Sequence, residues 1–168
     1  YGLQTLIQGT TGKTRAKYEA HLFDALKPGG FRHKSFAVDI IANLILSAEG
    51  PRKKVYEEYF YACHDDDVLS VLYSYIENLQ KMILNSKNED KDKYEKWLYA
   101  VIENNDPYVD VYDDPYIQVK ALEILMFLIR VEKDRATREE YKQYLSLMIE
   151  QNSEYVPTGF LKLVRGLT

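Results

Sequence analysis

Residues 113–131 constrain the fold more than any other segment, because they show the pattern of a capped helix that is apolar almost all the way round. Asp114 is placed to accept hydrogen bonds from the free N–H groups of the first turn, and Pro115 suits the first helical position. The later charged side chains fall on a single stripe, at spacings of three and seven: Lys120, Glu123 and Arg130. A helix with so narrow a polar stripe is expected to be surrounded by other helices on most sides.

A second helix of this kind is predicted over residues 33–48. Its polar residues recur every four positions on one stripe: Ser35, Asp39, Asn43 and Ser47. The same helical periodicity predicts further helices over residues 14–26, 52–62, 68–84, 93–103, 137–151 and 160–167.

The breaks between these helices follow from glycine, proline and polar runs. Gly50-Pro51 separates two of them, and the charged stretch 85–92 is expected to be a linker. Thr137 is predicted to cap the helix that follows it, while Glu140 reaches back to form a capping box.

These elements predict an all-α fold of about seven to eight helices in stacked antiparallel pairs. Residues 1–8 are either the end of a helix or a short extended piece. Each predicted pair takes about 35–45 residues, within the range of helix–turn–helix repeats, although no repeat at a fixed period is evident. We expect a single domain over residues 1–168 that is a fragment of a longer protein.

Residues 114–125 carry the pattern Asp-Pro-x-x-Gln-Val-Lys-x-Leu-x-x-Leu, which resembles the inner helix of a HEAT or armadillo repeat. Residues 33–44 fit that repeat more loosely, and residues 114–120 also resemble a run in the large adaptin subunits of vesicle-coat adaptors. The resemblance implies an α-solenoid in which the apolar positions pack inward. It also implies that Lys120 lies on the binding side.

Charge is distributed unevenly along the chain, although the net charge is only −4. Residues 1–54 hold nine Lys/Arg and four Asp/Glu, residues 55–114 hold five and fifteen, and residues 115–168 hold eight and seven. The acidic middle does not favour nucleic acid there. We therefore expect a protein partner, with a basic segment as one option, and no nucleic acid.

Cys63 is the single cysteine, so neither a disulfide framework nor a cysteine-based metal site is expected. A reducing, cytoplasmic compartment is the corresponding expectation. The apolar runs are too short to span a bilayer and a signal-peptide pattern is missing, so membrane insertion is not expected. The 15 tyrosines are expected mainly along seams between helices.

Gly12-Lys13-Thr14 is similar to the end of a phosphate-binding P-loop, which needs glycine N–H groups, a lysine for the phosphate oxygens and a threonine for Mg²⁺. That loop also requires a first glycine where this chain has Ile7, and the preceding residues make a poor strand. We interpret the segment as a Gly/Thr loop that caps the first helix. Nucleotide binding is kept as a remote alternative.

Residues 63–67, Cys-His-Asp-Asp-Asp, hold plausible metal-ligand types, but adjacent helical positions point apart. A solvated acidic cap at a helix start is the favoured interpretation.

The acidic loop 106–114 lacks the EF-hand spacing. It is interpreted as an ordinary solvated loop, with a recognition loop for a basic partner and a weak Ca²⁺ site as alternatives. No cofactor or metal site is predicted.

Six basic residues could share a surface: Arg52, Lys53, Lys54, Lys13, Arg15 and Lys17. A solvated surface is predicted, with contact to a partner or to a neighbouring acidic repeat as the alternative.

The side chains of Glu57 and Glu58 point in different directions on a helix, so their spacing does not make a catalytic pair. No nucleophile–base set can be assembled from local sequence, so no enzymatic activity is predicted.

The sequence thus favours a non-enzymatic interaction scaffold that binds a partner segment on the polar stripes of its inner helices. The predicted partner-binding residues are Asp39, Asn43, Lys120, Glu123, Asp110 and Asp113. The alternative is a compact all-α regulatory or defence-type domain that binds a small ligand in a tyrosine-lined pocket.

Overall fold

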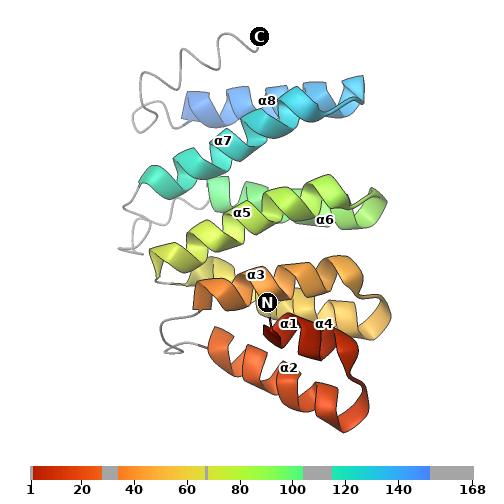
Figure 1. Ribbon diagram of the computed structural model, residues 1–168. Helices are drawn as coiled ribbons and strands as arrows, with labels where there is room; N and C mark the ends of the chain where they lie inside the picture. The colour runs from red at the N-terminus through yellow and green to blue at the C-terminus, as the bar shows by residue number, and fades with distance from the viewer. Residues whose placement is uncertain (1, 28–33, 67, 104–114, 152–168) are drawn as a thin grey trace. The chain divides into compact units, whose positions relative to one another are not determined.

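The computed structural model describes residues 2–27, 34–66, 68–103 and 115–151. Within these ranges the chain forms eight α-helices, one 3-10 helix and no strand (Figure 1), which confirms the predicted all-α class. The elements are α1 (Gly2–Gly9), α2 (Gly12–Leu26), α3 (Lys34–Ser47), α4 (Gly50–Tyr61), η1 (Ala62–Asp65), α5 (Leu69–Asn85), α6 (Asn88–Glu103), α7 (Pro115–Val131) and α8 (Arg135–Gln151).

Short linkers join these helices into hairpins. Two residues separate α1 from α2, α3 from α4 and α5 from α6, and three residues separate α7 from α8. A linker of this length reverses the direction of the chain, so the two helices of each pair run antiparallel.

One backbone conformation recurs at the start of the second helix in the first three hairpins. Gly12, Gly50 and Asn88 have φ angles of 56°, 62° and 52°, in the left-handed region. Glycine adopts this region without strain and asparagine tolerates it better than most residues. The three positions are 38 residues apart in both steps. The expectation that the chain has no fixed period is therefore wrong for this part of it.

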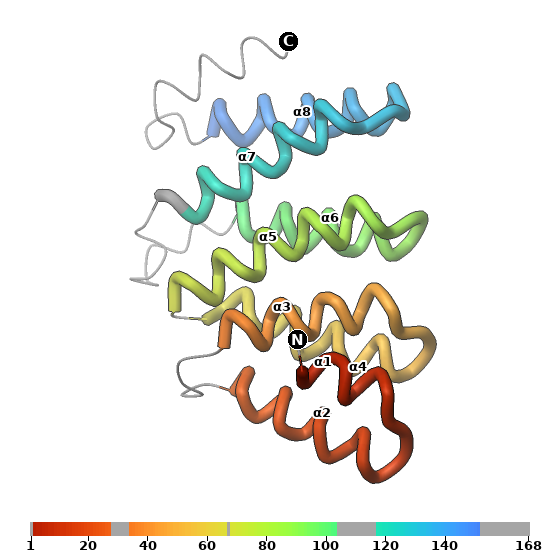
Figure 2. The backbone as a smooth tube through the Cα atoms, viewed as in Figure 1, coloured from red at the N-terminus to blue at the C-terminus, as the bar shows by residue number. Residues whose placement is uncertain are grey.

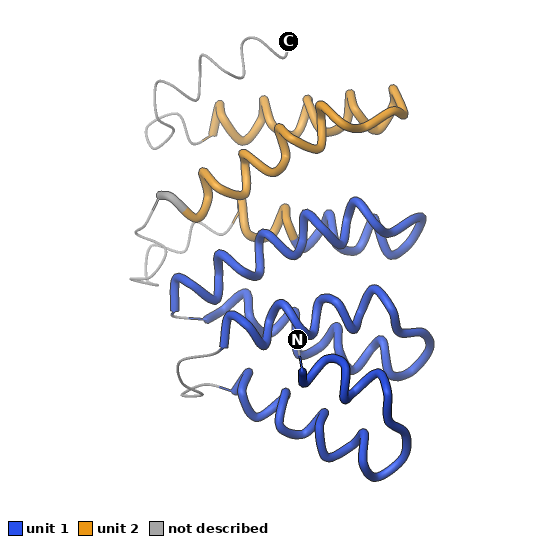
Figure 3. Tube along the Cα trace, viewed as in Figure 1, with its two compact units in different colours: residues 1–97 blue, residues 98–168 orange. Residues whose placement is uncertain are grey.

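The chain divides into two compact units, residues 1–97 and residues 98–168 (Figure 3), and each is described by itself. The expectation of a single domain stays a prediction.

Two rows of helices make up unit 1. In the inner row, α3 contacts both α1 and α5 (Figure 2). In the outer row, α4 is joined to α2 and to α6 by side-chain hydrogen bonds and by aromatic contacts. The 38-residue spacing carries over into the core, because Ile7, Ile45 and Ile83 occupy equivalent inner positions and are at most 1% exposed.

Unit 2 contains α7, α8 and the end of α6. α7 contacts α8, and Leu122, Leu125 and Leu145 on these two helices are each at most 4% exposed. The prediction that α7 is largely buried is thus confirmed. Its stripe of charged residues also holds an exposed aromatic side chain, Phe127, which is 40% exposed.

Several predicted boundaries differ from the structure. Residues 2–9 are a helix, and α6 begins at Asn88, inside the stretch predicted as a linker. Glu89 and Asp90 stand in the first turn of α6, where carboxylates complement the helix dipole. The charged stretch is therefore a helix start. The predicted helix over residues 160–167 lies outside the described residues.

The predicted capping box at Thr137 is wrong, because α8 begins one turn earlier. Asp134 is the capping residue, and its Oδ1 accepts hydrogen bonds from the Thr137 backbone N–H at 2.8 Å and from the Thr137 hydroxyl at 2.9 Å. Aspartate satisfies a free first-turn N–H as well as threonine does, so both residues are competent caps. The earlier cap adds three residues, 135–137, to the helix.

Candidate functional site

The polar stripe of α3 is hydrogen bonded to the neighbouring inner helix α5. Asn78 Nδ2 on α5 donates to Asp39 Oδ1 at 2.7 Å, and to the carbonyl of Ser74 at 2.8 Å. One turn along α3, Lys81 Nζ on α5 donates to Asn43 Oδ1. The stripe is therefore the place where two inner helices exchange polar contacts.

The opposite side of the same stripe meets α1. Asn43 Nδ2 donates to Gln4 Oε1 at 3.4 Å, and Gln8 Nε2 donates to Ser47 Oγ at 3.1 Å. Polar side chains thus follow one another across all three inner helices of unit 1. We name this row the polar seam, and it consists of Gln4, Gln8, Asp39, Asn43, Ser47, Asn78 and Lys81.

The polar seam is accessible but not fully solvated. Asp39 and Asn43 are half-buried, Ser47 and Lys81 are exposed, and Asn78 is buried. The structure therefore brings Asp39 and Asn43, with Ser47 of the same predicted stripe, together with four polar residues of α1 and α5 that the sequence pattern did not single out. Internal bonds occupy part of their hydrogen-bonding capacity. Their role in partner binding stays a prediction.

The predicted partner-binding residues of α7 belong to unit 2. Lys120 is half-buried, and Glu123 is exposed. Phe127 follows Glu123 by one turn and adds an apolar group to the same exposed stripe. The other two predicted residues, Asp110 and Asp113, lie outside the described residues.

A buried glutamate joins α2 to α4 in the outer row. Glu19 is 9% exposed, and it accepts hydrogen bonds from the Tyr56 hydroxyl and from Arg15 Nε, the latter at 3.0 Å. Arg52 Nε lies 3.1 Å from the same oxygen. Burial and the hydrogen bond to Glu19 raise the pKa of Tyr56. The tyrosine therefore stays a neutral donor to the carboxylate.

A second buried glutamate joins α4 to α6 in the same way. Glu57 is 7% exposed, and it accepts hydrogen bonds from the Tyr94 hydroxyl at 2.6 Å and from Lys93 Nζ at 2.7 Å. Burial, and then the hydrogen bond to Glu57, raise the pKa of Tyr94. Glu58 is exposed, so the structure does not bring the two adjacent glutamates together.

Aromatic pairs accompany these glutamates. Phe23 and Tyr59 stack with ring centroids 4.0 Å apart, and Tyr61 and Trp97 lie 5.0 Å apart at the next joint. The sequence marks these joints by Tyr-Glu at 18–19, 56–57 and 94–95, again at a spacing of 38. Helical periodicity does not predict these joints, because it relates positions within one helix and not between helices. The prediction that tyrosines line helix seams is confirmed at these positions.

Three of the six residues of the predicted basic surface, Arg15, Arg52 and Lys53, pair with carboxylates inside unit 1. Lys13 and Lys17 are exposed. Arg52 pairs with Glu19 on α2, and Lys53 pairs with Asp90 on α6. The hydrogen bond from Lys53 is the main cause that lowers the pKa of Asp90. Arg52 and Lys53 thus have acidic partners on neighbouring helices, as the alternative to a solvated surface expected, although Arg52 is itself exposed. That these helices are repeats stays a prediction. Lys54 is exposed.

The segment Gly12-Lys13-Thr14 opens a helix, as predicted, but follows another helix. A P-loop needs a strand before it, and α1 occupies that place. Thr11 is the residue at the cap of α2, and its side chain makes no capping hydrogen bond. The backbone of the loop is thus fixed mainly by the left-handed Gly12.

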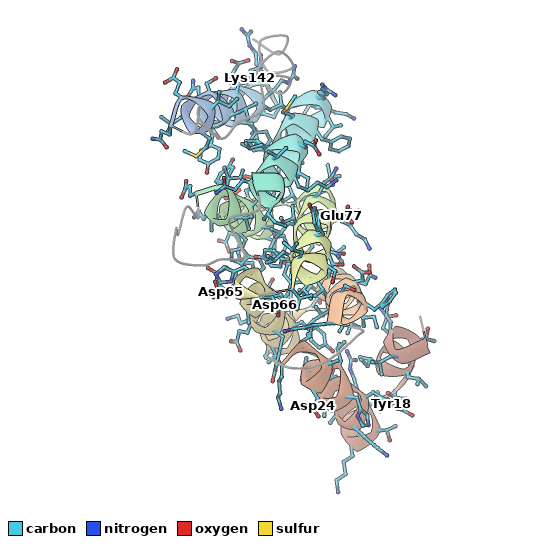
Figure 4. The ribbon with its side chains drawn as sticks, turned by 90° about the vertical axis from the view of Figure 1, so that its left-hand side faces the viewer. Tyr18, Asp24, Asp65, Asp66, Glu77 and Lys142 are labelled. Atoms are coloured by element: carbon cyan, nitrogen blue, oxygen red, sulfur yellow. The ribbon has the colours of Figure 1, made fainter. Side chains whose placement is uncertain are left out.

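Two of the acidic residues after Cys63, Asp65 and Asp66, are labelled in Figure 4 and have different partners, while Asp67 lies outside the described residues. Asp66 is buried and pairs with Lys34 at the start of α3, while Asp65 Oδ1 lies 3.0 Å from His64 Nε2. The predicted solvated cap is therefore wrong for Asp66. Its Oδ1 also accepts a hydrogen bond from Val68 N at 3.0 Å before α5. Among the described residues no group of three or more potential ligands could hold a metal ion.

Comparison of the chain with protein-family models, with curated proteins and with solved structures finds no match. In the part of the chain that the structure describes, no helix has the length and apolar character needed to cross a membrane.

Proposed function

We propose that the chain is a non-enzymatic protein-binding scaffold of the HEAT/armadillo type, and that a partner segment binds along its inner helices. The observation that carries the proposal is the polar seam, which crosses α1, α3 and α5 with four side-chain amides and a carboxylate. Gln4, Asp39 and Asn43 are half-buried, and Gln8 is exposed. A side-chain amide both donates and accepts hydrogen bonds, so a row of them suits the backbone of an extended segment.

The spacing of the helices supports this proposal. In a stack of helix pairs, equivalent positions of successive inner helices face the same surface and repeat along it. Asp39 on α3 and Glu77 on α5 are such equivalents, 38 residues apart, and Glu77 is exposed (Figure 4). A carboxylate at two successive positions favours a basic partner segment.

The same proposal places the chain in the cytoplasm, where its lone cysteine stays reduced, and includes no nucleic acid, cofactor or metal. A small-ligand domain with a tyrosine-lined pocket is less well supported. Tyr56 and Tyr94 fill the joints between outer helices, and their hydroxyls are bonded to glutamates of this chain. The hollow beside Tyr56 also contains the ion pair of Arg52 with Glu19.

The test is affinity capture from a lysate of the source organism with the full chain and with single variants. Glu77→Arg and Asn43→Arg alter the inner helices of unit 1, and Lys120→Glu alters the polar stripe of α7 in unit 2. Lys54→Glu is the matched control at an exposed position of the outer helix α4. We expect the inner variants to lose a protein that the wild type and the control both retain. Thermal unfolding of each variant separates lost binding from lost folding, since Asn43 also bonds within the chain.

The opposite result is equally informative. Capture that depends on Lys54 and not on the inner variants would move binding to the outer row and refute the assignment of the inner face. Capture of no protein by the folded wild type would refute the scaffold function.

A further inference from the structure

One face of the first helix pair, α1–α2, is more exposed than the equivalent faces of the next two pairs. Leu6 is 44% exposed, whereas the equivalent Leu44 and Met82, at steps of 38 residues, are 1% and 0% exposed. Leu3 is half-buried, whereas its equivalents Ile41 and Leu79 are both 0% exposed. Leu3 and Leu6 are thus leucines that stay partly exposed at positions that are buried and apolar in the next two pairs.

The outer helix of this pair shows the same difference. Tyr18 is half-buried, whereas its equivalents Tyr56 and Tyr94 are fully buried and donate to a glutamate of the preceding pair. One turn further along the helix, His21 is exposed, at the position of Tyr59 and Trp97. Figure 4 shows Tyr18 on α2, toward this end of unit 1.

We propose that this face of α1–α2 is a docking surface for a further helix pair of the same 38-residue type, whose outer helix carries a glutamate followed four residues later by phenylalanine or tyrosine. Two joints within the chain define that chemistry. Glu19 and Phe23 are four residues apart and meet Tyr56 and Tyr59, and Glu57 and Tyr61 meet Tyr94 and Trp97. The glutamate would accept a hydrogen bond from the Tyr18 hydroxyl, and the ring would lie against His21.

The two joints within the chain favour a further helix pair as the partner of this face, rather than a second copy of the chain. A head-to-tail copy would present α8, in which Tyr141 and Leu145 are buried like Tyr94 and Leu98 of α6. That register places Lys142 and Ser146 where α6 has Glu95 and Tyr99. A lysine ammonium cannot accept a hydrogen bond from the tyrosine hydroxyl, and a serine supplies no ring. The α8 face of such a copy, as far as the structure describes the chain, therefore lacks both groups.

The proposal is distinct from the inner-surface function, and the experiment tests it without a partner. The protein is lengthened by one pair, so that residues 1–49 are followed by residues 12–168. Glu49 then precedes the second Gly12 as it normally precedes Gly50, and the second Tyr18 faces the first Glu19. We expect a single cooperative thermal transition, because the added pair packs as the others do.

Tyr18→Phe supplies the decisive comparison. In the lengthened chain the change at the second Tyr18 should lower Tm by about 3–8 °C, the value for one hydrogen bond to a charged group in a domain of this size. In the natural chain the same change should shift Tm by less than about 1 °C, because within the described part of the chain no carboxylate is hydrogen bonded to the Tyr18 hydroxyl. In the lengthened chain, Glu19→Gln at the first Glu19 should lower Tm as much as Tyr18→Phe does. The double variant should lower Tm no further than either single variant, because both remove the same hydrogen bond.

Other outcomes overturn the proposal. These are a separate transition for the added pair, failure of the lengthened chain to fold, or an equal effect of Tyr18→Phe in both chains. Leu6→Glu in the natural chain provides an independent check. This change should leave Tm unchanged, whereas Leu44→Glu at the buried equivalent position should abolish folding. Light scattering that shows a dimer broken by Leu6→Glu would assign the face to a second copy instead.

Discussion

At the scale of single residues, Cys63 shows how burial controls chemistry. The thiol is 2% exposed and donates to the carbonyl of Tyr59 at 3.3 Å. Burial raises its pKa to about 12, and Asp66 adds to the effect, while Lys34 opposes it. Since the thiolate is the reactive form, we expect an alkylating reagent at pH 8 to modify the folded chain far more slowly than the chain in urea. Equal rates in the two states would show that Cys63 is accessible.

Leu122 tests the packing of α7 in the second unit. It is 4% exposed, so Leu122→Ala should lower the free energy of unfolding by about 2–5 kcal/mol by leaving a cavity. The neighbouring Glu123→Ala is the matched control, and on an exposed position it should change that value by less than about 0.5 kcal/mol. Both are measured by urea unfolding. A similar loss for the two variants would contradict the assignment of the inward face.

Tyr94 connects a buried side chain to the pH dependence of stability. Its pKa is raised in the folded state, so the folded state is favoured fully below the ordinary tyrosine pKa of about 10 and loses this advantage as pH rises. Tyr56 shifts in the same direction. In a spectroscopic titration we expect these phenols to ionise after the exposed ones, together with unfolding. Tyr94→Phe should remove one late-titrating group, and an unchanged late phase would refute the assignment.

At the scale of the elements, the hairpin linkers depend on a residue that accepts a left-handed backbone. Gly50 has φ 62°, and a Cβ added there would meet no atom within 4 Å. Gly50→Ala should therefore cost about 1–2 kcal/mol through backbone strain alone. Gly9→Ala is the matched control, because its surroundings are equally empty and its φ is not positive. Urea unfolding should show a loss only for Gly50, and equal effects would exclude strain as the cause.

Helix positions were largely predictable from periodicity, whereas starts and joints were not. The limits of α7, Pro115 and Val131, follow from the apolar run, but the start of α8 depended on whether Asp134 or Thr137 supplies the cap. Both residues are good caps, so local sequence does not choose between them. Packing against other helices does, since it stabilises the longer helix.

The candidate site was predictable only in part for a related reason. A polar stripe on α3 was evident from spacing, but the same pattern suits a solvated stripe and a seam between helices. Asn78 and Lys81 decide in favour of the seam, and they lie 39 and 38 residues from their partners Asp39 and Asn43. Contacts at that distance become predictable only once the 38-residue spacing is recognised. The buried pairs of Glu19 and Glu57 were missed for the same reason.

At the scale of the whole molecule, the helical architecture makes a further prediction about nucleotides. A P-loop holds phosphate because a strand and a helix fix the glycine-rich turn between them, and because a second strand supplies an aspartate for the metal. The described residues contain helices only, and α1 replaces the preceding strand. Lys13 and Thr14 are exposed at the start of α2, where a helix dipole alone attracts an anion weakly.

We therefore expect isothermal titration with ATP or GTP and Mg²⁺ to show no binding at micromolar concentrations. Lys13→Ala and the wild type should behave alike, and Lys17→Ala on the same helix is the matched control for loss of charge. Heat of binding that disappears in Lys13→Ala and persists in Lys17→Ala would contradict this expectation. Such a result would restore the nucleotide alternative, because it would assign to Lys13 a phosphate contact that charge alone does not explain.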